Sequence, residues 1–298
     1  MSIRYDVVHE TEYRYSSAVS VSRQALHLTP RALSWQKCVR HELHVSPAPT
    51  FRCDEADSFG NPLTRLEIDS PHDALLIAAR MEVEVSARGD DDGVDGEPDW
   101  QDAVAALAYV GGKIPSPELV EAIRFRCASP FVPALPELRA YALADFRPGV
   151  SALSAAAALM RRIHNDFRYD ATATHIATPL AEVFKRRRGV CQDFAHLMIG
   201  CLRALGLSAR YVSGYLLTAP AAGTPRLIGA DASHAWVSVW CPHGGWVDFD
   251  PTNDTRPQLA HVTLAWGRDF GDVSPLRGII LGGGEHELAV RVTVTPKT

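Results

Sequence analysis

The sequence of 298 residues contains no apolar run approaching the ~20 residues that a membrane-spanning helix requires. It also has no large excess of one charge, since 30 Lys and Arg residues oppose 35 Asp and Glu residues and the formal net charge is −5. A charge this small and this dispersed creates no field that would hold nucleic acid or an anionic membrane surface. We therefore expect neither nucleic acid nor a membrane among the partners.

The first residues, MSIRYDVVHETEYRY, lack the apolar segment of a secretory signal, which predicts a cytoplasmic location. The chain has six cysteines, and no two of them form a CxxC pair. They are Cys38, Cys53, Cys127, Cys191, Cys201 and Cys241. This spacing argues against a disulfide framework and a four-thiolate zinc site. We expect no cofactor.

Alternation of polar and apolar residues predicts an antiparallel β domain over residues 1–88; Met81, Val83 and Val85, for example, alternate with glutamates. Residues 89–99 are rich in Asp and Gly and are expected to form an acidic linker. We favour a solvated loop over a calcium site there, because the acid spacing does not match an EF-hand loop.

Beyond the linker the hydrophobic period changes toward 3.6, and we expect a core domain over residues 100–260. Helices are predicted at 100–110, 116–127, 136–146 and 151–167, and strands at 210–217, 233–240 and 245–250. Residues 261–298 form a β tail that is a candidate to pair with the N-terminal strands. The predicted fold class is therefore α+β, with an antiparallel β domain before the core.

The segment around Cys191 is the most informative part of the chain. TPLAEVFKRRRG predicts a helix with Thr178 as its N-cap, Pro179 at the first helical position and Gly189 as its stop. A second helix is predicted from Cys191 to Gly206, because apolar residues recur there at three- and four-residue steps. The sequence thus places a cysteine at a helix N-terminus.

A thiol at a helix N-terminus is suited to nucleophilic chemistry. The thiolate is the reactive form, and unpaired N–H groups together with the helix dipole favour the anion. The same N–H groups can hold the oxyanion that develops during acyl transfer. Cys191 is therefore a candidate nucleophile that needs a base.

His234 is the better of two candidate bases. His196 lies five residues after Cys191 and is rotated from it by about 140° around the helix, so a structural role is expected for it. His234 and Asp250 each lie eight residues from Pro242, in the turn of a predicted hairpin, which places them opposite each other. A carboxylate beside an imidazole orients it as a base.

Several alternatives stay open at this point. Asp248 shares a strand face with Asp250 and is a lesser candidate for the orienting acid. Gln192 and Tyr215 are both candidates for a second oxyanion donor, and Trp236 is a candidate for the wall of a substrate cleft.

A zinc site is disfavoured. It would be built from Cys191, His196, Cys241 and His243, and neither C-x4-H nor C-P-H is a familiar ligand spacing.

The segments GVCQDFAHL, RYVSGYL, SHAWVSVW and GWVDFDPTND together resemble the transglutaminase-like superfamily. HVTLAWGRDFGDVSPLRG is similar to the C-terminal signature of its bacterial members, and residues 1–88 to their N-terminal β domain, so the resemblance covers nearly the whole chain. It implies a papain-like core with Cys191 as nucleophile, His234 as base and Asp250 as orienting acid. The sequence departs from the calcium-activated animal crosslinkers, since it has no obvious calcium site.

Together, the residues and the resemblance predict a thiol-dependent acyl-transfer enzyme that acts on amide bonds through a covalent thioester. The expected substrate is a peptide or protein amide. Hydrolysis by a peptidase or amidase is the first expectation, and transfer to an amine by a protein-glutamine transglutaminase is the alternative. A non-catalytic binding module that uses the same cleft is the alternative of another class.

Overall fold

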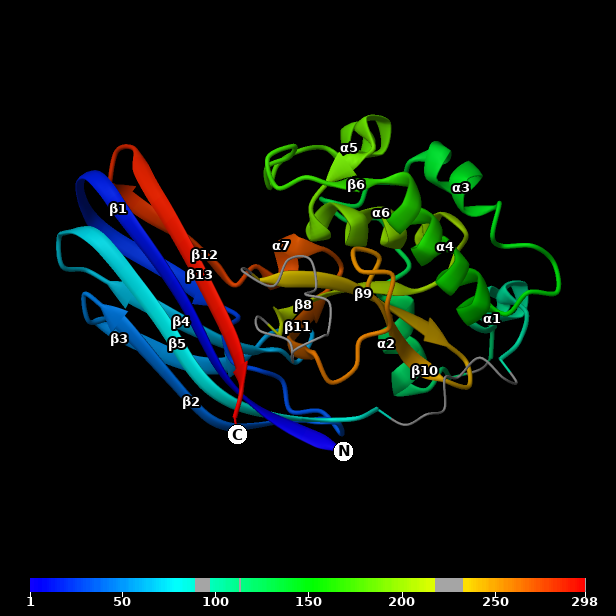
Figure 1. The fold of residues 1–298 in the computed structure, drawn as a ribbon, viewed down its shortest axis with the longest axis horizontal. Helices are drawn as coiled ribbons and strands as arrows, with labels where there is room; N and C mark the ends of the chain where they lie inside the picture. Colours follow the sequence, from blue (N-terminus) through cyan, green and yellow to red (C-terminus); the bar gives the residue numbers. More distant parts are fainter. Residues whose placement is uncertain (89–96, 113, 218–232, 298) are drawn as a thin grey trace.

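Strands occupy both ends of the chain, and most of the helices lie between them (Figure 1). The computed structural model describes residues 1–88, 97–112, 114–217 and 233–297. In these ranges no helix combines the length and the hydropathy needed to cross a membrane. The fold is α+β, as predicted, with an antiparallel sheet preceding a mixed core.

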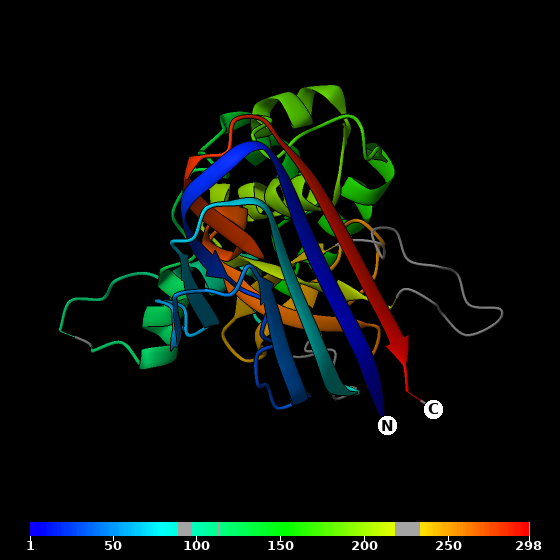
Figure 2. The ribbon, with the colours of Figure 1, turned by 90° about the vertical axis from the view of Figure 1, so that its left-hand side faces the viewer.

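A seven-stranded sheet forms the N-terminal β domain. Its strands are β1 (Ser2–Leu26), β2 (Gln36–Ser46), β3 (Phe51–Ala56), β4 (Pro62–Ile68), β5 (His72–Ser86), β12 (Leu276–Gly282) and β13 (His286–Pro296). The first part of β1 pairs with β5 and β13, and its last part pairs with β4 and β12. Figure 2 shows β5, β1 and β13 running side by side in cyan, blue and red.

The predicted alternation sets which face of this sheet is buried. Tyr5, Val7 and His9 of β1 are buried, while the residues between them are more exposed. In β13, Val292 and Val294 are buried whereas Leu288 and Val290 are exposed. Val294 and Val292 lie beside the buried Val7 and His9, and Leu288 lies beside Tyr13, which is only half-buried.

The core combines a four-stranded antiparallel sheet, in the order β10, β9, β8, β11, with helices and a short two-stranded ladder. The sheet strands are β8 (Ala209–Leu216), β9 (His234–Cys241), β10 (Gly245–Phe249) and β11 (His261–Gly267), and the ladder pairs β6 (Arg168–Tyr169) with β7 (Arg188–Gly189). The helices are α1 (Trp100–Ala106), α2 (Pro117–Ile123), α3 (Pro136–Ala142), α4 (Ala152–Asp166), α5 (Leu180–Arg186), α6 (Cys191–Ala204) and α7 (Phe270–Val273). Helix α6 packs on β8 and β9, and it is almost entirely buried.

The predicted boundary at residue 260 is wrong in one respect. β11 begins at His261 and pairs with β8, so it belongs to the core sheet and not to the tail. The strands that join the N-terminal sheet begin only at Leu276. Most of the predicted acidic linker, and with it the discarded calcium site, lies outside the described residues.

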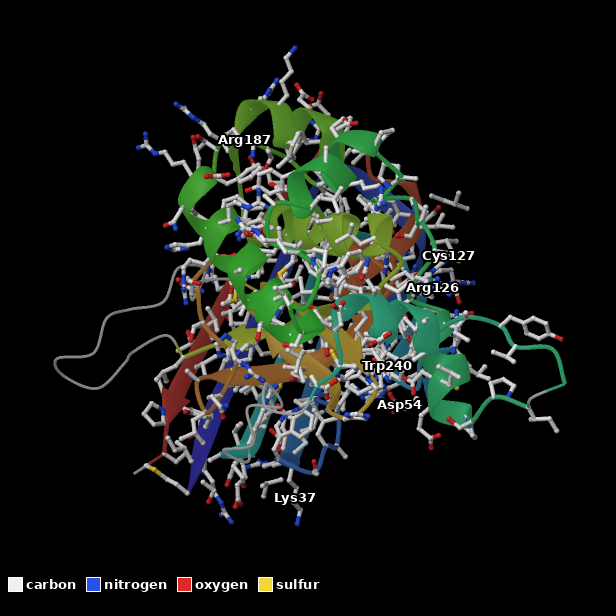
Figure 3. The ribbon with its side chains drawn as sticks, turned by 90° about the vertical axis from the view of Figure 1, so that its right-hand side faces the viewer. Lys37, Asp54, Arg126, Cys127, Arg187 and Trp240 are labelled. Atoms are coloured by element: carbon white, nitrogen blue, oxygen red, sulfur yellow. The ribbon has the colours of Figure 1, made fainter. Side chains whose placement is uncertain are left out.

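Helix α5 differs from its predicted ends. Pro179 is its N-cap, and its C-cap is Arg187, which adopts the left-handed conformation with φ of 56°. Aromatic rings surround that guanidinium, whose Cζ lies 4.3 Å from the ring centre of Phe184 and 4.6 Å from that of Phe167. These contacts hold a non-glycine residue in a conformation usually taken by glycine. Figure 3 labels Arg187 among the helices, at the top of the view.

Two side-chain amides of the N-terminal domain bind the outer edge of β11. Gln36 donates to the carbonyl of Thr263 and accepts from its N–H, each at 2.7 Å. Asn61 makes the same pair of bonds with Trp266, at 2.8 and 2.9 Å. A register shift between Thr263 and Ala265 turns the backbone of Trp266 toward this edge. The N-terminal domain therefore supplies the hydrogen bonds that a further strand would make.

Candidate active site

Cys191 is the first residue of α6, as the sequence predicts. The helix starts sharply because the Asp193 carboxylate, three residues past the N-cap, accepts hydrogen bonds from the Val190 N–H at 2.8 Å and from the Thr174 hydroxyl at 2.7 Å. The thiol is buried, with 9% of the residue exposed. Cys191 thus lies at the positive end of a long buried helix.

His234, at the start of β9, lies between Asp250 and Cys191. Its Nε2 donates to Oδ2 of Asp250 at 2.8 Å, and both side chains are fully buried. Burial by itself lowers the pKa of His234. The charges of Asp250 and of the Cys191 thiolate, with the hydrogen bond to Asp250, outweigh burial and raise that pKa to about 10. Nδ1 has no hydrogen-bond partner among the described residues, so this nitrogen is left for the thiol.

The carboxylate of Asp250 is held by several donors. Oδ1 accepts from the N–H groups of Thr252 at 3.0 Å and Asn253 at 3.3 Å. Oδ2 accepts from the Asn253 side-chain amide at 2.8 Å and from Nε2 of His261 at 3.3 Å, in addition to His234. Burial raises the pKa of Asp250, but these interactions, those with His234 above all, hold it well below its usual value. Asp250 is therefore ionised.

The hairpin register differs from the predicted symmetry by two residues. Phe249 pairs with Val237 and Asp248 with Ser238, so the ladder extends to place Asp250 beside Trp236. Because side chains alternate with a period of two, this shift keeps Asp250 and His234 on the same face. The carboxylate reaches the imidazole along the diagonal of the ladder.

Asp248, the lesser candidate, has other partners. Its Oδ2 accepts from Nη1 of Arg88 at 2.6 Å and from Nε1 of Trp236 at 3.0 Å. Trp236 is fully buried, which is at odds with its predicted place in the wall of a cleft. Its ring packs against the rings of His234 and His261. Trp236 therefore packs against the two histidines, and Asp248 holds its ring through a hydrogen bond.

The two candidate oxyanion donors differ in position. Tyr215 is fully buried, and its hydroxyl is hydrogen-bonded to Nδ1 of His9 at 2.9 Å, in the contact between the domains. This bond removes Tyr215 as a donor near Cys191. Gln192 follows Cys191 directly in α6 and is only half-buried. It remains the candidate.

His196 has the structural role expected of it. Its Nε2 accepts from the N–H of Phe270 at 3.1 Å, and its ring lies between those of Phe131 and Tyr211. Burial lowers the pKa of His196 to about 3, so the ring is neutral. His243, part of the disfavoured zinc site, is exposed.

Sequence reasoning missed two members of the site. His261 lies in a segment noted only for its family resemblance, beyond the predicted end of the core. Tyr211 was assigned only to a strand; the structure places it near Cys191, and burial together with the charge of the thiolate raises its pKa well above the ordinary value. The signal for both was their presence in the motifs HVTLAWG and RYVSGYL.

Similarity to known proteins covers both domains. Residues 5–84 match a family model for the bacterial transglutaminase-like N-terminal region, and residues 144–251 match one for the transglutaminase-like superfamily. A protein of Mycobacterium tuberculosis named as uncharacterized is 40% identical over 306 residues, which cover 98% of this chain and 93% of that protein. The protein-glutamine gamma-glutamyltransferase of Pseudomonas aeruginosa is 38% identical over 128 residues, covering 40% of this chain and 19% of that enzyme.

The fold has a counterpart among solved structures. The crystal structure of a protein from Cytophaga hutchinsonii called a "putative cysteine protease" superposes with a TM-score of 0.75 and 21% identity, covering 99% of this chain and 91% of that one. At this identity the likeness concerns the fold alone. With both domains matched in order and a relative matched over nearly its full length, the chain belongs to the transglutaminase-like superfamily.

Proposed function

We propose that the protein is a thiol-dependent acyl-transfer enzyme, in which Cys191 attacks an amide carbonyl and forms a thioester. One observation carries the proposal: His234 binds the ionised Asp250 through Nε2, its Nδ1 has no partner among the described residues, and the charge of the Cys191 thiolate acts on its ring. In this arrangement His234 takes the thiol proton and later protonates the leaving amine, while Asp250 fixes its tautomer. The thiol adds to the carbonyl carbon, the C–N bond breaks, and the amine leaves with the proton.

The thioester then passes its acyl group to water or to an amine. We favour water, which makes the protein a peptidase or amidase acting on a peptide or protein amide in the cytoplasm. Similarity to a protein-glutamine gamma-glutamyltransferase over 128 residues supports amine transfer as the second candidate. A catalytically inactive binding module would need neither a reactive thiol nor the buried His234–Asp250 ion pair, whose desolvation is costly.

Selective alkylation tests the nucleophile. Iodoacetamide at neutral pH, followed by peptide mapping, should modify Cys191 faster than Cys127, although Cys191 is buried and Cys127 is exposed. Figure 3 labels Cys127 on the outer surface of the core. Accessibility alone predicts the opposite order, so the result separates activation from exposure. A His234→Ala variant should lose the selectivity, and a wild-type chain in which Cys191 labels no faster than Cys127 or Cys38 would exclude the mechanism.

A library of proteome-derived peptides then separates the two reactions. The wild-type protein and a Cys191→Ala control are incubated with the library, with and without a biotinylated primary amine. Hydrolysis gives new peptide termini or deamidated side chains, whereas amine transfer gives biotinylated glutamine residues. Neither product should form with Cys191→Ala.

A further inference from the structure

His261 is a second histidine on the carboxylate that orients the proposed base. It opens β11, is fully buried, and its Nε2 lies 3.3 Å from Oδ2 of Asp250, the oxygen that also accepts from His234. Asn253 donates to the same oxygen at 2.8 Å. Three donors thus converge on one carboxylate oxygen, and two of them are imidazoles.

The surroundings keep His261 neutral and fix its tautomer. Burial is the main influence that lowers its pKa, the charges of His234 and Arg88 lower it further, and Asp250 raises it without overcoming the others. A neutral ring next to an ionised carboxylate carries its proton on the facing nitrogen, Nε2. Nδ1 has no hydrogen-bond partner among the described residues. His261 therefore donates one hydrogen bond, and that bond goes to Asp250.

The core sheet is shaped to allow this contact. β8 separates β9 from β11, and its Gly214 lies opposite His234 on one side and Thr263 on the other. A Cβ atom on Gly214 would come within 2.4 Å of the Trp236 ring, which packs edge-on against His261 with centroids 5.3 Å apart. The missing side chain at Gly214 makes room for the ring that supports both histidines.

The N-terminal domain holds the strand that carries His261. Gln36 makes its two hydrogen bonds with Thr263, two residues after His261. The Tyr5 hydroxyl donates to the carbonyl of Leu259, two residues before His261, at 3.0 Å. The N-terminal β domain therefore helps to position His261.

We propose that His261 is a positioning residue that acts through Asp250. It donates a hydrogen bond to Oδ2 and so limits how strongly that carboxylate holds the proton on His234. The inference rests on the proposed function and deepens it. Thr252 and Asn253 already fix the carboxylate in place, so removing His261 changes the strength of the acceptor more than its position. A base held too strongly in its protonated form is a weaker acid toward the leaving amine.

Titration of His234 in labelled protein tests the proposal. Among the described residues, Cys191, Asp250 and His261 are the titratable groups that act on His234, and NMR of histidine-labelled protein follows its ring directly. The variant His261→Ala should raise the His234 midpoint by roughly half to one pH unit. The variant His261→Gln, whose amide can donate from a similar position, should restore it. A midpoint that stays or falls in His261→Ala would overturn the proposal.

Two controls separate this effect from other causes. His27 is also a buried histidine facing an aspartate, Asp57 at 3.2 Å, but it lies in the N-terminal domain. The variant His27→Ala should cost stability without moving the His234 midpoint. Asp250→Asn should lower that midpoint, and if it does not, the proposed function itself fails, whatever His261 does.

A metal ion is the competing explanation for the cluster. His234, Asp250 and His261 offer ligand atoms that all lie within 4.8 Å of one another. Metal-bound histidines usually donate their other ring nitrogen to a second partner, and here Nδ1 of His261 has none in the described ranges. Calorimetry with Zn²⁺ decides: stoichiometric binding by the wild type that is lost in His261→Gln would overturn the positioning role.

Discussion

A Cβ atom on Gly189 would lie 2.5 Å from Oδ2 of Asp193, the oxygen that accepts from Val190 and Thr174 at the start of α6. The variant Gly189→Ala should therefore displace this carboxylate and destabilise the helix start by about 1–3 kcal/mol. Urea denaturation measures the loss. Gly111→Ala, where nothing lies within 4 Å of the added atom, is the matched control. If the two variants lose the same stability, Asp193 is not what requires glycine at residue 189.

The two hydrogen bonds between the Gln36 amide and the backbone of Thr263 in β11 should stabilise the fold, because they pair a buried N–H and a buried carbonyl. Gln36→Leu leaves the N–H and carbonyl of Thr263 buried and unpaired, and we expect a loss of about 1–3 kcal/mol in the free energy of unfolding. Gln36→Glu keeps the acceptor for the Thr263 N–H and loses the donor. The glutamate carboxylate would also be buried against the carbonyls of Arg31 and Thr263, so denaturation should show both variants to be less stable than the wild type. If Gln36→Leu is as stable as the wild type, the hydrogen bonds between Gln36 and Thr263 do not contribute to the free energy of unfolding.

Asp250 and Asp248 lie on the same strand face but should differ in their effect on the thiol. Asp250→Asn removes the charge that keeps His234 protonated, so alkylation of Cys191 at neutral pH should slow roughly tenfold or more. Asp248→Asn weakens the ion pair with Arg88 and should lower stability while leaving selective labelling in place. Peptide mapping of time courses measures both rates. Equal slowing in the two variants would contradict the assignment of the orienting acid.

The raised pKa of His234 makes stability depend on pH with a definite sign. Its folded pKa of about 10 lies above the unfolded value of about 6.5, so the charged ring stabilises the fold fully below pH 6.5. That contribution is lost as pH rises toward 10, at no more than about 1.4 kcal/mol per pH unit. Asp250 is a principal cause of this shift.

The measurement is cleanest without the thiol, because the charge of Cys191 also raises the pKa of His234. Urea denaturation of Cys191→Ala, where Asp250 alone raises the His234 pKa, should show this decline ending below pH 10. Cys191→Ala with His234→Gln should show a flatter profile over the same range. Parallel profiles for the two proteins would mean that His234 is not held in its charged form.

The sequence was sufficient to locate the first members of the site because each lies in a short local pattern. Cys191 follows a glycine stop and opens an apolar helical repeat, and His234 with Asp250 flank a hairpin that a Pro- and Gly-containing turn defines. Local periodicity carries this information directly. The two-residue error in the hairpin register did no harm, because an even shift preserves the face.

His261 and the two amides that bind β11, Gln36 and Asn61, could not be found in this way. Their roles depend on contacts between segments far apart in the sequence, such as Gln36 with Thr263, and no periodic pattern records such a pairing. The left-handed Arg187 is similar: the aromatic rings that contact it come from α3, from the residue that follows α4 and from α5. Where a residue's conformation is set by distant partners, the local signal points elsewhere, here to Gly189.

The pairing of β1 with β13 has a consequence for synthesis on the ribosome. β1 is translated before the core domain and β13 after it, so β1 lacks this neighbouring strand while the core is being made. Until then, one long edge of β1 stays open to other chains. Nascent protein should thus depend on protection of that edge, and its N-terminal sheet should reach native resistance to proteolysis only after β13 has emerged from the ribosome.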